Sequence, residues 1–166
     1  ITDSHCHLSA DAFAEDRDEV LKRTAAAGVS RAVVIASDAE DAGWIHDWIG
    51  SPGTPHGGVA LWGTAGVHPH YAERATPEAL DAVALLCGGP AVAVGECGLD
   101  FHYDTAPRQV QFDALHAQVE IADRTGLPLV VHSRSADPEM RDVLRALPDG
   151  VLGVLHCFTG GEALMH

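Results

Sequence analysis

Short apolar runs alternate with longer helical patterns along this chain, and this alternation constrains the fold more than any other feature of the sequence. The apolar runs are rich in β-branched residues and mostly continuous, which is typical of buried parallel strands. They occupy residues 2–7, 32–36, 60–67, 91–95, 129–132 and 151–156, and the helical patterns occupy residues 14–27, 39–49, 77–87, 108–124 and 138–147. Strand–helix units thus repeat every ~25–35 residues, which predicts an α/β domain built on a parallel sheet.

The size and charge of the chain limit the classes of protein to which it can belong. The 166 residues suffice for one domain, and no linker or low-complexity tract divides them, so we expect a single domain over residues 1–166. No apolar run approaches the ~18 residues that a membrane-spanning helix needs. Ten basic against 24 acidic residues give a net charge of −14, which argues against binding of nucleic acid mainly through a basic surface. A nucleic-acid enzyme of this charge would attract phosphate through bound metal and a few arginines.

The four cysteines are expected to be reduced. They are scattered, form no CxxC pair, and are too few for a disulfide framework, so we expect free thiols. The first residues contain neither a basic region nor an apolar signal core, and we expect a cytoplasmic location.

Five candidate metal ligands lie at the carboxyl ends of four predicted strands. They are His5, His7, Glu96, His132 and His156. An open flavodoxin-like sheet would spread ligands from such distant strands along one edge, whereas a closed (β/α)8 barrel brings them together at the end where its active site lies. The sequence therefore favours a TIM-type barrel.

The spacing of His5, Cys6 and His7 has a direct geometric meaning. Alternate side chains of a strand share a face, so both imidazoles point the same way and can bind one ion, while Cys6 points to the opposite face. The same alternation predicts that Cys97 and Cys157 point away from the ligands. We therefore interpret these three cysteines as packing residues.

Four imidazoles and one carboxylate predict a site for two divalent ions. Such ligands suit zinc, manganese or iron better than calcium, and magnesium is a further candidate. A catalytic ion usually takes three protein ligands, so five ligands fit two ions bridged by Glu96. An unpaired carboxylate would be costly to bury in the apolar strand that contains Glu96. Two such ions can activate a water molecule and clamp a phosphoryl or carbonyl oxygen.

Other polar residues are expected on the same rim. His68 can contact substrate or satisfy backbone in a turn that contains proline, and His70 is the weaker candidate. Arg134 matches the geometry of phosphate oxygens, although a surface salt bridge is its alternative. Asp100 can orient a metal-binding imidazole. Surface or structural roles are expected for the histidines away from the strand ends, which are His46, His56, His102, His116 and His166.

These motifs resemble those of the TatD family of metal-dependent hydrolases. Five blocks match in family order, at residues 3–8, 66–70, 95–100, 131–134 and 155–160, and Arg108, Gln111 and Phe112 also fit the pattern. The resemblance implies metal-dependent 3′–5′ exonuclease-like cleavage of phosphodiester bonds in DNA, with a water molecule activated by two metals. It implies one ion held by His5, His7 and Glu96, and a second held by His132, His156 and the bridging Glu96. From their residue chemistry, Glu96, His68 and Arg134 are the expected catalytic residues.

The resemblance also implies a barrel with two further strands and a late aspartate, which this chain does not reach. We therefore expect the N-terminal portion of a barrel, truncated at its C-terminus, with about six of the eight strands. Its open strand edges favour self-association.

Two alternatives remain open. One is a carboxylate-bridged hydrolase of an ester, lactone or amide. Hydrolases bridged by a carbamylated lysine are excluded, because the bridging position is Glu96 and the only lysine, Lys22, lies in a predicted helix. The other alternative is an inactive, truncated metal-binding module.

Overall fold

Parallel strands form a curved, open layer in the computed structural model, which describes residues 1–165. One sheet has the order β1-β2-β4-β3 and the other β5-β6-β7. The bounds are β1 Thr2–Cys6, β2 Arg31–Val34, β3 Thr54–His56, β4 Val59–Gly63, β5 Val94–Asp100, β6 Leu129–Arg134 and β7 Gly153–Leu155. A parallel bridge between Ala65 and Val94 links the two sheets, so the layer continues from β4 to β5.

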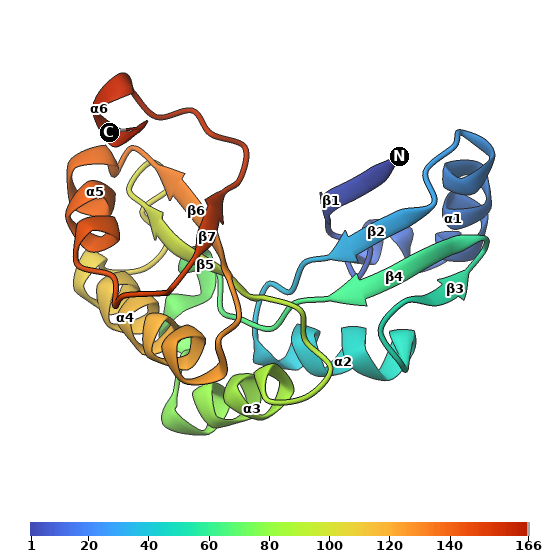
Figure 1. The fold of residues 1–166 in the computed structure, drawn as a ribbon, viewed down its shortest axis with the longest axis horizontal. Coiled ribbons are helices and arrows are strands. Elements are labelled where there is room, and N and C mark those ends of the chain that lie inside the picture. The colour runs from blue at the N-terminus through green and yellow to red at the C-terminus, as the bar shows by residue number, and fades with distance from the viewer. Residues whose placement is uncertain (166) are drawn as a thin grey trace.

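Helices cover the outer side of this layer (Figure 1). They are α1 Arg17–Ala26, α2 Ala39–Ile49, α3 Pro77–Cys87, α4 Arg108–Thr125, α5 Asp137–Arg145 and the short α6 Glu162–Met165, with 3₁₀ turns η1 Asp11–Phe13 and η2 Pro69–Arg74. Local chemistry sets several ends: the side chains of Asp38 and Thr76 cap the first turns of α2 and α3, and Gly126 ends α4 in the left-handed conformation.

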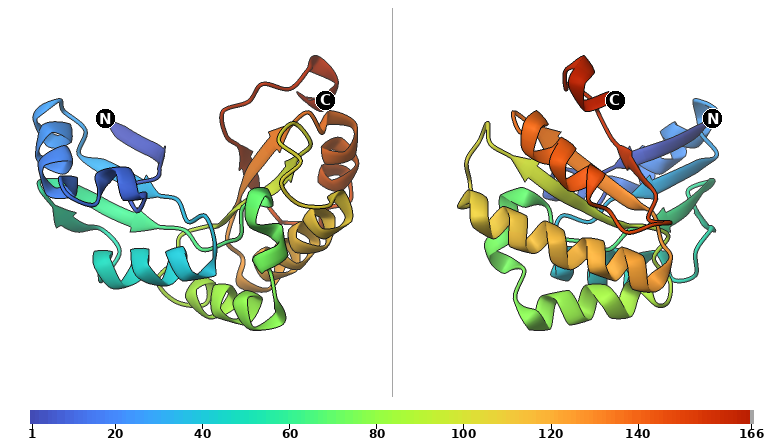
Figure 2. Two further views of the ribbon diagram at one scale, coloured as in Figure 1. Left: turned by 180° about the vertical axis from the view of Figure 1, so that it is seen from behind. Right: turned by 60° about the vertical axis from the view of Figure 1, so that its left-hand side comes forward.

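The predicted α/β class with parallel strands in barrel order is confirmed, but the layer does not close. Within residues 1–165, β1 and β7 end the parallel layer, and the side between them is open, as Figure 1 and the left view of Figure 2 show. The short antiparallel strand β3 was not predicted. It pairs with β4 through a turn at Gly57 and Gly58, both with positive φ.

The predicted strand at residues 91–95 is wrong in its bounds. Strand β5 begins at Val94 and continues to Asp100, and all seven of its residues are buried. Gly95 and Glu96 interrupt the apolar run, but the strand continues because the buried polar groups beyond them find partners, as described below.

Two buried glutamines of α4 form hydrogen bonds with the backbone of Val67 and of Asp100. The Gln118 side chain accepts from Val67 N at 2.8 Å and donates to Val67 O at 3.1 Å. Gln111 makes the equivalent pair with the backbone of Asp100, at 2.8 and 3.1 Å. The chain next to His68 and the end of β5 are thereby held in place.

Among residues 1–165, no helix is both long and apolar enough to cross a membrane. His166, expected in a surface or structural role, lies outside the described residues.

Candidate metal centre

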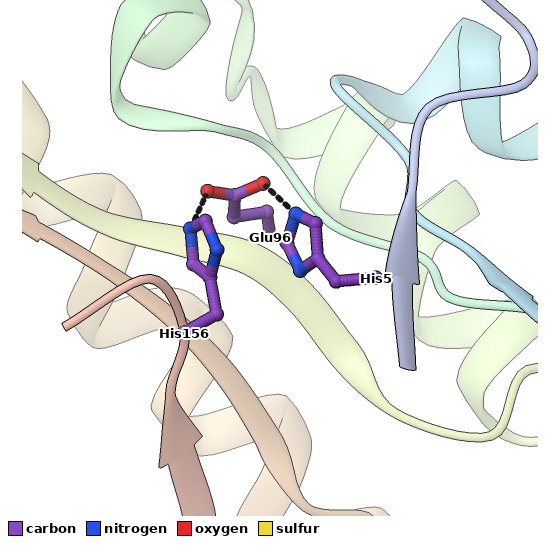
Figure 3. Close-up of side chains that lie close together, drawn as sticks. All are labelled: His5, Glu96 and His156. Carbon is purple, nitrogen blue, oxygen red and sulfur yellow. Dashed lines mark ion pairs between the residues drawn. The ribbon is translucent and has the colours of Figure 1, made fainter. Parts of the chain in front are cut away.

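Glu96 lies at the centre of a cluster of histidines. Its side chain is almost completely buried in β5, yet its carboxylate lies within 3.5 Å of nitrogens from five imidazoles. The distances are 3.2 Å to His5 Nε2, 3.5 Å to His7 Nε2, 3.5 Å to His68 Nε2, 3.0 Å to His132 Nδ1 and 2.5 Å to His156 Nε2. Figure 3 shows His5, from β1, and His156, from the segment after β7, approaching the two oxygens of this carboxylate.

The strand ends bring these side chains together. His5 is in β1, His7 follows it, and His132 is in β6; His156 follows β7, and His68 precedes η2. The parallel strands run in the same direction, so their carboxyl ends meet around Glu96. The rings of His5 and His156 stack with centroids 3.9 Å apart, although 150 residues of chain separate them.

Close approach of β5 to β6 depends on Gly98. Its φ is +146°, and a Cβ atom at this position would lie 1.9 Å from the carbonyl oxygen of His132. Only glycine lets the two strands approach closely enough to bring His132 to Glu96.

Several nitrogen and oxygen atoms of the cluster lack hydrogen-bond partners. His5 Nδ1, Glu96 Oε2 and His156 Nε2 are buried, and none has a partner with suitable hydrogen-bond geometry, even where the distance is short. Nε2 of His7 lies 3.2 Å from Nε2 of His5, while Nδ1 of His7 lies 3.2 Å from the carbonyl oxygen of Ile35. Donation of Nδ1–H to that carbonyl leaves the Nε2 lone pair facing the cluster. Converging lone pairs need a proton or a cation between them, and this donor set fits a divalent metal.

Three groups of side chains bring ligand atoms within 4.8 Å of one another. They are His5–Glu96–His156, His68–Glu96–His132 and His70–Asp100–His132. Glu96 belongs to two of these groups, which is the arrangement expected of a bridging carboxylate. The expected division of ligands pairs His7 with His5, whereas these groups join His156 to His5; the division between two ions stays a prediction.

The electrostatics of the cluster follow from its burial and its hydrogen bonds. Burial alone would raise the pKa of Glu96, but hydrogen bonds from the surrounding imidazoles outweigh it and hold this pKa well below its usual range. Burial lowers the pKa of His7 and of His68. For His132, burial opposes protonation, but the Glu96 and Asp100 carboxylates together raise its pKa.

Asp100 contacts the cluster through the ring of His132. Its Oδ2 lies 2.7 Å from His70 Nε2 and 3.1 Å from His132 Nε2, and its Oδ1 accepts from the backbone nitrogens of His102 and Tyr103. Burial would raise the pKa of Asp100, but these hydrogen bonds lower it to about 2. The contacts match the expected orienting role, which stays a prediction. Arg134 is exposed at the end of β6 and lines a cavity of about 300 Å³ next to His132 and His156.

The interpretation of three cysteines as packing residues is wrong for Cys157. Cys6 is half-buried and donates to the carbonyl oxygen of Val33, and Cys97 is buried. Strand β7, however, ends at Leu155, so strand alternation does not extend to Cys157, which is exposed with a φ of +43°.

The histidines expected in surface or structural roles fit these roles as far as residue 165. His46 and His56 approach the backbone carbonyls of Thr64 and Ile49, respectively. His102 and His116 are exposed.

Comparison with known proteins agrees with this geometry. The model of the TatD-related DNase family matches residues 2–166. The chain is 36% identical over 159 residues to the 3′-5′ ssDNA/RNA exonuclease TatD of Erwinia amylovora, covering 95% of this chain and 60% of that protein. It is 37% identical over 175 residues to a Mycobacterium tuberculosis protein named "Uncharacterized metal-dependent hydrolase TatD", with 99% and 63% covered.

Solved structures give the same result. The TatD homologue YJJV of Escherichia coli superposes with a TM-score of 0.85 at 29% identity, covering 99% of this chain and 64% of that one. A TatD family hydrolase of Entamoeba histolytica gives a TM-score of 0.83 at 26% identity, with 99% and 60% covered. This chain thus spans about 60% of the length of the curated relatives it matches. From the family match, the shared sequence and the shared fold, we conclude that the chain belongs to the TatD-related DNase family.

Proposed function

We propose that this chain carries the main metal site of a hydrolase that cleaves phosphodiester bonds in DNA, with the character of a 3′–5′ exonuclease. The observation that carries the proposal is the buried Glu96 carboxylate within 3.5 Å of five imidazoles. Relatives that are about 36% identical are named 3′-5′ ssDNA/RNA exonucleases, which supports the same substrate class.

We also propose that the site binds two divalent ions. His5, His7 and Glu96 would hold one ion, and His132, His156 and Glu96 the other. Zinc, manganese and iron are the candidates that the nitrogen-rich ligand set favours, and magnesium is a further candidate through the Glu96 carboxylate. When bound, the ions would supply Lewis-acid activation of water and neutralise charge on the phosphate.

The residues of the chain have distinct tasks in this reaction. Glu96 contributes a carboxylate that stays ionised at neutral pH, because its pKa is held low. Asp100 fixes the ring of His132 through the contact at 3.1 Å. Arg134, exposed on the rim, binds a phosphate of the substrate, and His68 lies close enough to Glu96 to hold a proton or contact the reacting group.

Self-association and a cytoplasmic location belong to the same proposal. Self-association is supported by the outer strand β7, whose Val154 is 54% exposed, and by Leu152 just before it, 73% exposed. A cytoplasmic location is supported by the four cysteines, all of which are free thiols.

Two measurements on the purified chain test the function. Elemental analysis should find close to two ions per chain, falling in the double variant His5→Ala/His7→Ala. Release of nucleotides from single-stranded DNA should depend on the metal and decrease at least ~100-fold in Glu96→Gln, while Glu120→Gln, an exposed change on α4, should match the unaltered chain.

The outcomes separate the alternatives. Background release by both the unaltered chain and Glu96→Gln, despite full metal loading, would identify an inactive metal-binding module. Cleavage of esters or lactones without cleavage of DNA would identify the other hydrolase class.

A further inference from the structure

Tyr103 is an exposed aromatic side chain next to the metal cluster. It lies just beyond the end of β5 and is 55% exposed. Its ring lies 5.3 Å from the ring of His70 in an edge-to-face arrangement. Nε2 of His70 in turn contacts the Asp100 carboxylate that also contacts His132. An exposed aromatic surface is thus linked to a proposed ligand, His132, through the side chains of His70 and Asp100.

The position of Tyr103 is fixed by the same carboxylate. Asp100 Oδ1 accepts from Tyr103 N at 3.0 Å and from His102 N at 2.9 Å, while Oδ2 contacts His70 and His132. One buried side chain therefore sets both the turn that carries Tyr103 and the orientation of a metal-binding imidazole. A surface held this rigidly relative to the cluster loses little entropy when a ligand binds to it.

Arg134 lies over this ring. Its guanidinium carbon is 4.8 Å from the centroid of Tyr103. The backbone supports the pairing, since Phe101 N donates to the carbonyl of Arg134 at 2.9 Å. Within the described residues, Arg134 has no carboxylate within ion-pair distance, so its charge is available to a phosphate.

The rim on this side of the cluster differs in charge from the rim beside His7. The cavity next to Arg134 is lined by His132, Ser133, Arg134, His156, Cys157 and Thr159, which include no carboxylate. The cavity of about 350 Å³ beside His7 includes Asp11, Asp38 and Asp41 in its lining. Arg74 on that side is already paired with Asp38 at 2.6 Å. A polyanion is therefore attracted to the Arg134 side and repelled from the other.

We propose that Tyr103 and Arg134 form a stacking platform for a base of single-stranded nucleic acid, and that the strand leaves the metal cluster over this platform. The inference deepens the proposed function, from which it takes the substrate class. Stacking on an aromatic ring combined with a nearby arginine is how proteins bind single strands without reading sequence. A stacked base carries no information about the sugar, so DNA and RNA strands bind the platform alike.

Binding to two matched oligomers tests the platform without requiring hydrolysis. The probes are a fluorescent oligothymidylate and an abasic oligodeoxyribose of the same length, both with phosphorothioate linkages that resist cleavage. Fluorescence anisotropy with the metal-loaded chain gives Kd for each. Tyr103→Ala should weaken binding of the base-bearing oligomer roughly 5- to 100-fold and leave the abasic oligomer within about twofold. Tyr103→Phe, which keeps the ring, should bind like the unaltered chain.

Tyr71 supplies a matched control. It is 39% exposed and also lies under a guanidinium, that of Arg74, but it is on the acidic side. Tyr71→Ala should change neither Kd by more than about twofold. An equal loss for both oligomers in Tyr103→Ala, no loss in that variant, or no measurable binding by the unaltered chain would overturn the platform. Absence of hydrolysis with this binding pattern intact would overturn the proposed function alone.

Discussion

His132 lies between two carboxylates: its Nε2 is 3.1 Å from Oδ2 of Asp100, and its Nδ1 is 3.0 Å from Oε1 of Glu96. A neutral imidazole carries one N–H, so it can donate to only one of the two carboxylates. Without metal, the protonated ring satisfies both, and for this reason the pKa of His132 is raised although burial opposes it. A metal ion bound at either nitrogen must displace that proton, so metal affinity falls as the pH decreases.

Replacement of Asp100 tests this coupling. In the metal-free chain, Asp100→Asn should lower the pKa of His132, measured by NMR titration, because one of the two carboxylates is lost. Metal affinity measured by calorimetry should fall about 10- to 100-fold, as is usual when the partner that orients a ligand is removed. Asp104→Asn alters an exposed carboxylate in the same turn and should change neither quantity. An unchanged affinity in Asp100→Asn would mean that His132 does not bind the ion.

The pair of hydrogen bonds between Gln118 and Val67 should contribute strongly to stability. Gln118→Ala leaves a buried N–H and a buried carbonyl of Val67 without this partner, which should lower the free energy of unfolding by about 2–4 kcal/mol in urea denaturation. Gln109, on the same helix, donates a hydrogen bond to the exposed Asp113. Gln109→Ala should cost less than about 0.5 kcal/mol. Equal costs for the two variants would contradict this assignment.

Self-association through the outer strand β7 can be tested by placing a charge on it. Val154 is 54% exposed and pairs through β7 only with β6 among the described residues. Val154→Lys should shift the chain toward the monomer in sedimentation velocity at matched concentration, because a lysine on an edge strand opposes strand pairing. Glu120→Lys places the same charge at an exposed position of α4 and should leave the association unchanged. Association that persists in Val154→Lys would rule out β7 as the contact.

The sequence was sufficient to predict the parallel α/β order and to single out the residues around Glu96. Both follow from local rules, because alternation along a strand turns His5 and His7 the same way and strand ends in a barrel meet. The sequence did not predict that His68 lies close to Glu96. This proximity depends on the turn before η2 and on Gln118, which lies 51 residues along the chain from the Val67 backbone that it contacts.

The features that the sequence did not predict depend on the exact residue at which each strand ends. The strand β7 ends one residue earlier than predicted, and this single residue turns Cys157 from a packing residue into an exposed one. The strand β5 extends past the predicted end because Gln111 satisfies the backbone of Asp100. Such partners are distant in sequence and leave no local pattern.

His46 should make stability depend on pH independently of the metal site. It is buried in α2, and Nε2 lies 3.2 Å from the carbonyl oxygen of Thr64, to which a neutral ring donates. Burial lowers the pKa of His46 from the ordinary value of 6.5. The unfolded chain therefore binds a proton at a higher pH than the folded chain does, so this contribution to stability is complete above pH 6.5 and is lost as the pH falls through the lower folded-state pKa.

The comparison of two histidine variants isolates this effect. His7 and His68 also have lowered pKa values, and His132 has a raised one. Urea denaturation of the unaltered, metal-free chain between pH 8 and about pH 5 therefore reports all four groups together. His46→Gln keeps a side-chain donor but has no titrating ring, and its stability should decline less over this range. His116→Gln, an exposed change on α4, should follow the unaltered chain throughout. If His46→Gln lost stability with the same slope as the unaltered chain, His46 would not be the buried neutral imidazole that its contact with Thr64 indicates.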